Sequence, residues 1–196
     1  MKKLKIVVDP DPISPREWDN MGRIAYKHPR YKLGEEEISD PIEWLEGMLF
    51  IENKGEYSGE RLRELEQRFY REYIALPVYL YDHSGITMST TPFSCNWDSG
   101  KVGYVYVSKK EARLHMGVNK ITKKVRERIE TNLRYEVEAF DQYLTGEVFC
   151  FVVEDEEGNM IDSCCGFYGQ DWGDNGMKDY LSEELWPKLE GIEVEY

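Results

Sequence analysis

The longest regular pattern in this sequence is the apolar periodicity of residues 120–144, KITKKVRERIETNLRYEVEAFDQYL. Apolar side chains recur at spacings of three or four, the period of one helix face. They are Ile121, Val125, Ile129, Leu133, Val137, Phe140 and Leu144. The pattern predicts a long amphipathic helix that any fold of this chain has to accommodate.

Other helices are predicted from their start signals. The stretches SPRE at 14–17, DPIE at 40–43 and SKKE at 108–111 each place a capping residue three positions before a glutamate. The third helix is expected to stop at Gly117, because glycine tolerates the conformation that ends a helix. Residues 60–73 have apolar side chains on one face, which predicts an amphipathic surface helix.

Strands are expected where Val, Tyr and Ile gather between turn residues. The predicted strands are 5–8, 75–82, 86–90 and 101–108, with a hairpin over 146–169 that turns near Gly158. A last helix is expected over 177–189, shortened or kinked at Pro187. This mixed order fits an α+β fold better than regular alternation. We predict one compact α+β domain, residues 1–196, with a mixed or antiparallel sheet.

Composition supports a globular chain. Apolar residues make up 41% of the 196 residues and aromatic residues 13%, more than a disordered chain carries. A chain of this length buries roughly 70% of its unfolded surface, enough for one good core.

Location is predicted from two sequence features. The basic start MKKLKIVV is interrupted by Asp9 to Pro12 before any cleavage-like site, and no run approaches the ~18 apolar residues of a membrane span. We expect a soluble protein of the cytoplasm, with no membrane contact. Its cysteines, Cys95, Cys150, Cys164 and Cys165, are expected to be thiols.

Residues 81–100, YDHSGITMSTTPFSCNWDSG, gather chemically active side chains. Asp82, His83 and Ser84 cannot form a hydrolase triad, because consecutive residues of an extended chain alternate in direction. Cys95 as nucleophile with His83 as base is possible if the segment folds back, with Asp82 or Asp98 as the orienting acid. The other interpretation is structural: two turns flank a short strand, and Cys95 is a small buried hydrophobe.

Metal and cofactor signatures are missing from the sequence. The stretch DWGDNG at 171–176 resembles the start of a calcium loop but has Gly173 at its third position and Ser182 at its twelfth. There is no phosphate-binding loop, dinucleotide fingerprint or zincin motif, and the histidines are scattered. We expect no metal and no cofactor.

Charge is unevenly distributed along the chain. Residues 1–108 carry 14 basic and 18 acidic side chains, residues 109–129 carry 8 and 2, and residues 130–196 carry 3 and 18. The basic run can face a phosphate backbone or compensate neighbouring acid; the surrounding acid repels phosphate, so we do not expect direct nucleic-acid binding. The acidic third either keeps the protein soluble or mimics DNA phosphates for a partner. The residues predicted to contact that partner are Glu154, Asp155, Glu156, Glu157, Asp162, Asp171 and Asp174.

Four stretches carry a family resemblance. SPREWDNMG (14–22), LPVYLYDHSGITMSTTPFSCNWDSGKVGYVYVS (76–108), GEVFCFVVEDEEGN (146–159) and DSCCGFYG (162–169) resemble a family of small proteins encoded by bacteriophages and mobile elements. The resemblance implies a phage accessory protein and supplies no catalytic residues.

The sequence therefore favours a binding role over an enzymatic one. We expect the protein to bind a host or phage protein through its acidic surface and thereby to inhibit a host nucleic-acid-handling or defence system. The alternative is a thiol-dependent enzyme or small-ligand binder centred on residues 81–100.

Overall fold

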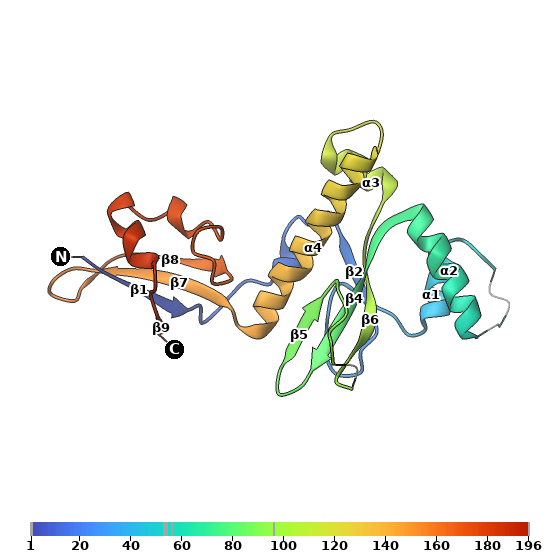
Figure 1. Ribbon diagram of the computed structural model, residues 1–196, viewed down its shortest axis with the longest axis horizontal. Helices are drawn as coiled ribbons and strands as arrows, with labels where there is room; N and C mark the ends of the chain where they lie inside the picture. The colour runs from blue at the N-terminus through green and yellow to red at the C-terminus, as the bar shows by residue number, and fades with distance from the viewer. Residues whose placement is uncertain (1, 53–54, 56, 96, 196) are drawn as a thin grey trace. The chain divides into compact units, whose positions relative to one another are not determined.

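A computed structural model describes residues 2–52, 55, 57–95 and 97–195. The chain forms two compact units: a terminal unit of residues 1–17 and 139–196, and a central unit of residues 18–138 (Figure 1). Helix α4 (Lys123–Thr145) contributes residues to both. The chain combines helices with two mixed sheets, so the predicted α+β class is confirmed. The expected domain boundaries, 1–196, stay a prediction.

The central unit is built on a five-stranded sheet in the order β3-β2-β6-β4-β5. Its strands are β2 (Arg23–Tyr26), β3 (Glu36–Glu37), β4 (Tyr73–Asp82), β5 (Ile86–Ser89) and β6 (Ser99–Ser108). Strands β2 and β3 are parallel, whereas the other neighbours are antiparallel. The predictions for 75–82, 86–90 and 101–108 thus correspond to β4, β5 and β6.

Helices α1 (Pro41–Met48) and α2 (Gly59–Glu72) cover one face of this sheet (Figure 1). Tyr104 and Tyr106 of β6 point to them, and Trp44 of α1 stacks on Tyr104 with ring centroids 5.5 Å apart. Side chains of a strand alternate between faces, so Val105 points the other way. There it lies close to Gly22 and to Leu133 of α4. Leu133 is one of the residues that the periodicity of residues 120–144 places on the apolar face of this helix.

Most helix starts follow the predicted caps. Asp40 accepts hydrogen bonds from the backbone of Ile42 and Glu43 at the start of α1, and Ser108 with Glu111 forms a capping box for α3 (Lys109–Met116). Gly117 ends α3 with φ 62°, a left-handed conformation that suits glycine. The stretch at 14–17 forms only the 3-10 helix η1 (Pro15–Glu17).

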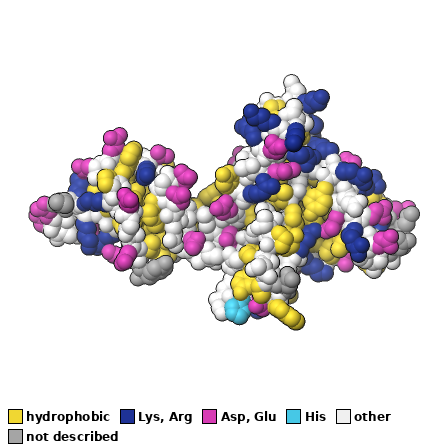
Figure 2. Space-filling view, viewed as in Figure 1, with side chains coloured by type: hydrophobic (Ala, Val, Ile, Leu, Met, Phe, Trp, Pro, Cys, Tyr) yellow, Lys and Arg dark blue, Asp and Glu magenta, His cyan; other side chains and the backbone are white. Residues whose placement is uncertain are grey.

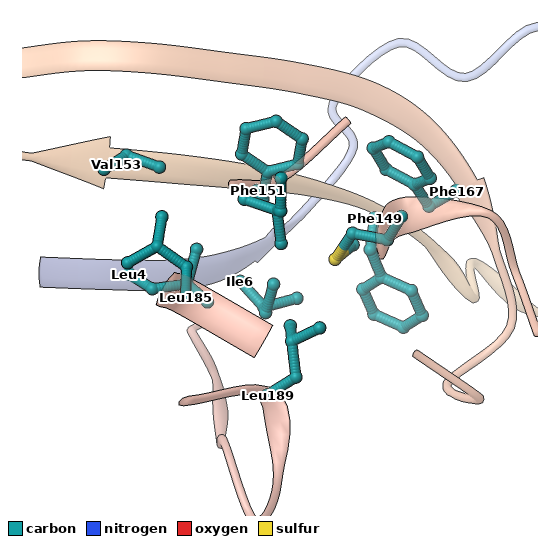
Figure 3. Close-up of a cluster of buried hydrophobic side chains, with 10 residues drawn as sticks. Leu4, Ile6, Phe149, Phe151, Val153, Phe167, Leu185 and Leu189 are labelled. Carbon is teal, nitrogen blue, oxygen red and sulfur yellow. The ribbon is translucent and has the colours of Figure 1, made fainter. Parts of the chain in front are cut away.

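The terminal unit has a four-stranded sheet in the order β8-β7-β1-β9. Its strands are β1 (Lys3–Val8), β7 (Val148–Glu154), β8 (Met160–Tyr168) and β9 (Val194–Glu195). Figure 3 shows side chains of β1, β7 and β8 packed against Leu185 and Leu189, which come from the C-terminal segment. This cluster is the core of the terminal unit.

The segment that covers this core differs from the prediction. Residues 177–189 form two 3-10 helices, η2 (Met177–Asp179) and η3 (Glu183–Leu189), where one helix was expected. Pro187 lies inside η3 and has no N–H to donate, which is incompatible with a regular helix interior. Strands β2, β3 and β9 are also additions that the sequence did not indicate.

The cysteines differ from the expectation as well, because Cys150 and Cys165 form a disulfide. Strands β7 and β8 pair with a bulge: Phe149 lies opposite Phe167 and Phe151 opposite Cys164. This register brings the Cα atoms of Cys150 and Cys165 to 3.9 Å. Among the described cysteines, Cys95 and Cys164 keep free thiols.

No helix in the described part of the chain has both the length and the hydropathy needed to cross a bilayer.

Candidate functional site

The four residues predicted for catalysis meet at one end of the central sheet. Asp82 ends β4, His83 lies in the turn to β5, and Asp98 immediately precedes β6. Strand β4 pairs with both β5 and β6, so the backbone N–H of Asp82 donates to the Asp98 carbonyl at 2.8 Å. Two segments separated in the sequence are thereby held side by side.

Asp98 contacts both the predicted nucleophile and the predicted base. Its Oδ2 atom is 3.3 Å from Nδ1 of His83 and 3.9 Å from Sγ of Cys95. In the part of the chain that the structure describes, no hydrogen bond joins His83 to Cys95. The contact of His83 with Asp98 is the one expected of an orienting acid, and the pairing of His83 with Cys95 stays a prediction.

Asp82 has a different partner. Its Oδ2 forms an ion pair with Nη2 of Arg30, a residue of the loop that follows β2. The Arg30 guanidinium also lies over the Tyr31 ring, 5.2 Å from its centroid. Sequence reasoning missed Arg30 because 52 positions separate it from Asp82. We call Arg30, Asp82, His83, Cys95 and Asp98 the loop cluster.

His28 belongs to the same loop and is half-buried. Its Nδ1 atom accepts hydrogen bonds from the backbone N–H groups of Arg30 at 3.3 Å and Tyr31 at 3.2 Å. Burial lowers the pKa of His28 below its ordinary value of 6.5, outweighing the opposite effect of the Asp82 carboxylate. His28 therefore fixes the loop as a neutral acceptor.

The chemistry available to the loop cluster is limited. A nucleophilic cysteine is stabilised as thiolate by neighbouring positive charge, whereas Cys95 faces a carboxylate. The His83 side chain is 62% exposed, in solvent rather than in a closed site. Two cavities of the described chain, about 690 and 630 Å³ in volume, are lined by residues outside 81–100.

One other group brings possible metal ligands together. Among the described residues, ligand atoms of Asp9, Cys150 and Cys165 lie within 4.8 Å of one another. The two sulfurs are bonded to each other in the disulfide, and Asp9 accepts a hydrogen bond from the Gly166 N–H at 3.1 Å. These atoms already have structural partners.

Net charge separates sharply between the two units. The terminal unit has 6 basic and 18 acidic residues, a net charge of −12, whereas the central unit has 19 and 20, a net charge of −1. Nearly all of the formal charge of −13 is therefore in the terminal unit. Figure 2 shows acidic side chains at the end where the β7–β8 hairpin turns, while acidic and basic side chains are interspersed over the rest of the visible face.

Residues at the hairpin turn have distinct roles. Glu154 pairs with Lys5 across the sheet at 2.6 Å, so its charge is compensated. Asp155 accepts hydrogen bonds from the backbone and side chain of Asn159, and these bonds lower the pKa of its carboxyl. Glu156 and Glu157 are exposed at the tip.

The remaining predicted contact residues lie on β8 and in the loop after it. Asp162 is exposed on β8 opposite Val153. Asp171 accepts hydrogen bonds from the N–H groups of Gly173 and Asp174, which close the loop on itself. Asp174 is exposed. The acidic surface thus combines exposed charges with carboxylates that also hold turns.

The basic segment 109–128 is partly compensated by nearby groups. Lys123 pairs with Glu127 at 4.0 Å and Arg126 with Glu130 at 3.5 Å, both within α4. Lys109 donates to the Arg71 carbonyl at 2.5 Å. This agrees with the compensating role considered for these charges.

Comparisons of the chain with protein-family models, curated proteins and solved structures gave no match. The resemblance to phage-encoded proteins therefore stays a prediction.

Proposed function

We propose that this chain is a phage accessory protein that acts by binding a protein partner through its terminal unit, and that the partner belongs to a host nucleic-acid-handling or defence complex. The observation that carries the proposal is the net charge of −12 in the terminal unit beside −1 in the central unit. A charge needed only for solubility has no reason to be confined to one unit.

The physical basis is the recognition of phosphate by cationic side chains. Proteins that handle nucleic acids bind them largely through contacts of Lys and Arg side chains with phosphate. A groove lined by these side chains responds mainly to negative charge. Glu156, Glu157, Asp162 and Asp174 present exposed carboxylates on a unit with a disulfide and its own core. Carboxylates on a rigid frame can occupy the place of phosphates.

The enzymatic alternative has weaker support. The loop cluster brings together Asp82, His83, Cys95 and Asp98, but among the described residues no hydrogen bond joins the base His83 to the thiol of Cys95. A catalytic cysteine needs a positive charge beside it, whereas the group in contact with Cys95 is a carboxylate and the Arg30 guanidinium of the cluster pairs with Asp82.

Competition with nucleic acid tests the proposal. The protein is immobilised, exposed to an extract of infected host cells, and eluted with duplex DNA at constant ionic strength. We expect DNA to release the bound proteins, because both ligands use the same cationic groove. If the captured proteins stay bound in excess DNA, the proposal that this protein binds its partner by mimicking phosphates is wrong.

A further inference from the structure

One of the two cavities named above lies within the terminal unit and has a volume of about 690 Å³. It is bordered by the loop after β8 and by the end of η3 with the turn that follows. Its lining includes Asp171, Trp172, Lys178, Trp186 and Glu190. The volume is in the range of sites that bind small molecules or single side chains with their flanking backbone.

Both tryptophans are held in fixed positions. Trp172 packs edge-on against the core residue Phe149, with ring centroids 5.2 Å apart. Trp186 donates from Nε1 to the carbonyls of Lys178 and Leu181, each at 3.2 Å, while 39% of the residue remains exposed. Rigid indoles offer large contact surfaces with little loss of conformational entropy on binding.

The charged groups of the lining favour a cationic ligand. Asp171 and Glu190 are both exposed, and Asp171 is oriented by the backbone N–H groups that it accepts. Lys178 is the basic side chain among the described residues of the lining. The terminal unit as a whole has a net charge of −12, which attracts cations to the cavity.

We infer that this cavity receives an arginine side chain from a basic segment of the partner protein. The inference rests on the proposed function, since it names the feature of the partner that the acidic unit recognises. A guanidinium stacks on an indole and binds a carboxylate through two parallel N–H donors, whereas an ammonium acts as a hydrated point charge. Trp and Arg are also the residues most enriched at the energetic centres of protein interfaces.

Lys178 should have the opposite effect on arginine binding to that of the two carboxylates. Lys178 lines the cavity together with Asp171 and Glu190, so its positive charge opposes the binding of a guanidinium. Removing Lys178 should strengthen binding, while neutralising Asp171 or Glu190 should weaken it. A role of these residues in folding alone predicts no such opposite effects.

The test uses the full protein and the peptide N-acetyl-Gly-Arg-Gly-amide, followed through the indole N–H signals of Trp172 and Trp186 by NMR. Peptides with lysine or citrulline in place of arginine serve as comparisons. We expect both indole signals to shift with the arginine peptide, a weaker effect with lysine and none with citrulline.

Variants distinguish the effect of charges inside the cavity from the effect of the net charge of the terminal unit. Asp171→Asn keeps the acceptor oxygen that the loop needs. Asp171→Asn and Glu190→Gln, made separately, should each weaken peptide binding by about threefold to tenfold. Lys178→Gln should tighten it by a similar factor. Glu157→Gln makes the same charge change at the hairpin tip, outside the cavity, and should change it less than about twofold.

Unshifted indole signals at saturating peptide, or equal binding of the citrulline or lysine peptide, would overturn the arginine site. The proposed function fails separately, if DNA does not displace the captured proteins. If the arginine peptide binds but DNA does not release the captured proteins, the arginine site is supported and the phosphate-mimicking surface is contradicted.

Discussion

At Asp98 one carboxylate oxygen lies within reach of two side chains, Nδ1 of His83 at 3.3 Å and Sγ of Cys95 at 3.9 Å. The residue types of the loop cluster were visible in the sequence, and their meeting at one end of the sheet follows from β4 pairing with β5 and β6. Their order in space did not follow, because it depends on the loop between Thr90 and Asp98. The contact of Arg30 with Asp82 depends on the loop after β2, where Arg30 lies 52 positions before Asp82.

Asp98→Asn should make Cys95 more reactive. Two unit charges about 4 Å apart in water interact by about 1 kcal/mol, so removing the carboxylate charge should raise the alkylation rate about fivefold. The measurement is iodoacetamide labelling at pH 7.5 in a Cys164→Ser background, which removes the other free thiol. If Asp98→Asn or His83→Ala instead slows the reaction, His83 activates Cys95 and the enzymatic alternative gains support.

His28 predicts a pH dependence of stability. Its pKa in the folded protein is below the unfolded value near 6.5, so the folded state binds fewer protons than the unfolded state. The stability it contributes is present above pH 6.5 and is lost as pH falls through the folded pKa. His28→Asn keeps an acceptor for the backbone of Arg30 and Tyr31 without titrating. Urea unfolding between pH 7.5 and 5 should therefore show a shallower decline for His28→Asn; identical slopes would contradict this.

Among the elements, helices α1 and α3 matched their predictions, whereas the same kind of start signal at 14–17 produced only the 3-10 helix η1. Asp40, Ser108 and Gly117 fix the ends of α1 and α3 through bonds to backbone groups a few residues away. Strands β2, β3 and β9 have four residues or fewer and form only because a distant strand is beside them. Residues 177–189 were expected to form one helix, but they form η2 and η3, and Pro187 lies inside η3.

Strands β6 and β2 approach closely at Gly103. A Cβ atom there would lie 1.9 Å from the Ala25 carbonyl oxygen, so Gly103→Ala should destabilise the protein by about 2–3 kcal/mol. Gly100 lies in the same strand with nothing within 4 Å of an added Cβ, and Gly100→Ala is the matched control. Chemical denaturation should distinguish the two variants; equal stability would show that the approach relaxes at little cost.

The disulfide between β7 and β8 should stabilise the terminal unit. It closes a loop with a sequence separation of 15, for which loop-closure entropy gives about 3 kcal/mol. Thermal unfolding with and without a reducing agent should show this loss in the wild type. Cys150→Ser with Cys165→Ser should unfold at the same temperature under both conditions, and Cys164→Ser should behave as wild type. No effect of reduction on the wild type would contradict the stabilising role.

For the whole molecule, the main property is the division of charge between the two units. The sequence already showed an acidic last third, with 3 basic and 18 acidic residues in 130–196. It could not show that residues 1–17 join residues 139–196, because that depends on β1 pairing with β7 and β9. The fold thus assigns a net charge of −12 to one unit and −1 to the other.

Capture by charge-reversed variants tests the central claim most directly. Glu156, Glu157 and Asp162 are replaced together by lysine, and the control replaces Glu52, Glu72 and Glu138, exposed acids of the central unit, in the same way. Both variants have the same net charge, so a general effect of charge would lower capture of the partner from infected-cell extract equally. We predict that the control retains the partner, that the first variant loses it, and that added salt releases it from the wild type. Equal capture by all three proteins, or equal loss in both variants, would contradict binding through the terminal unit.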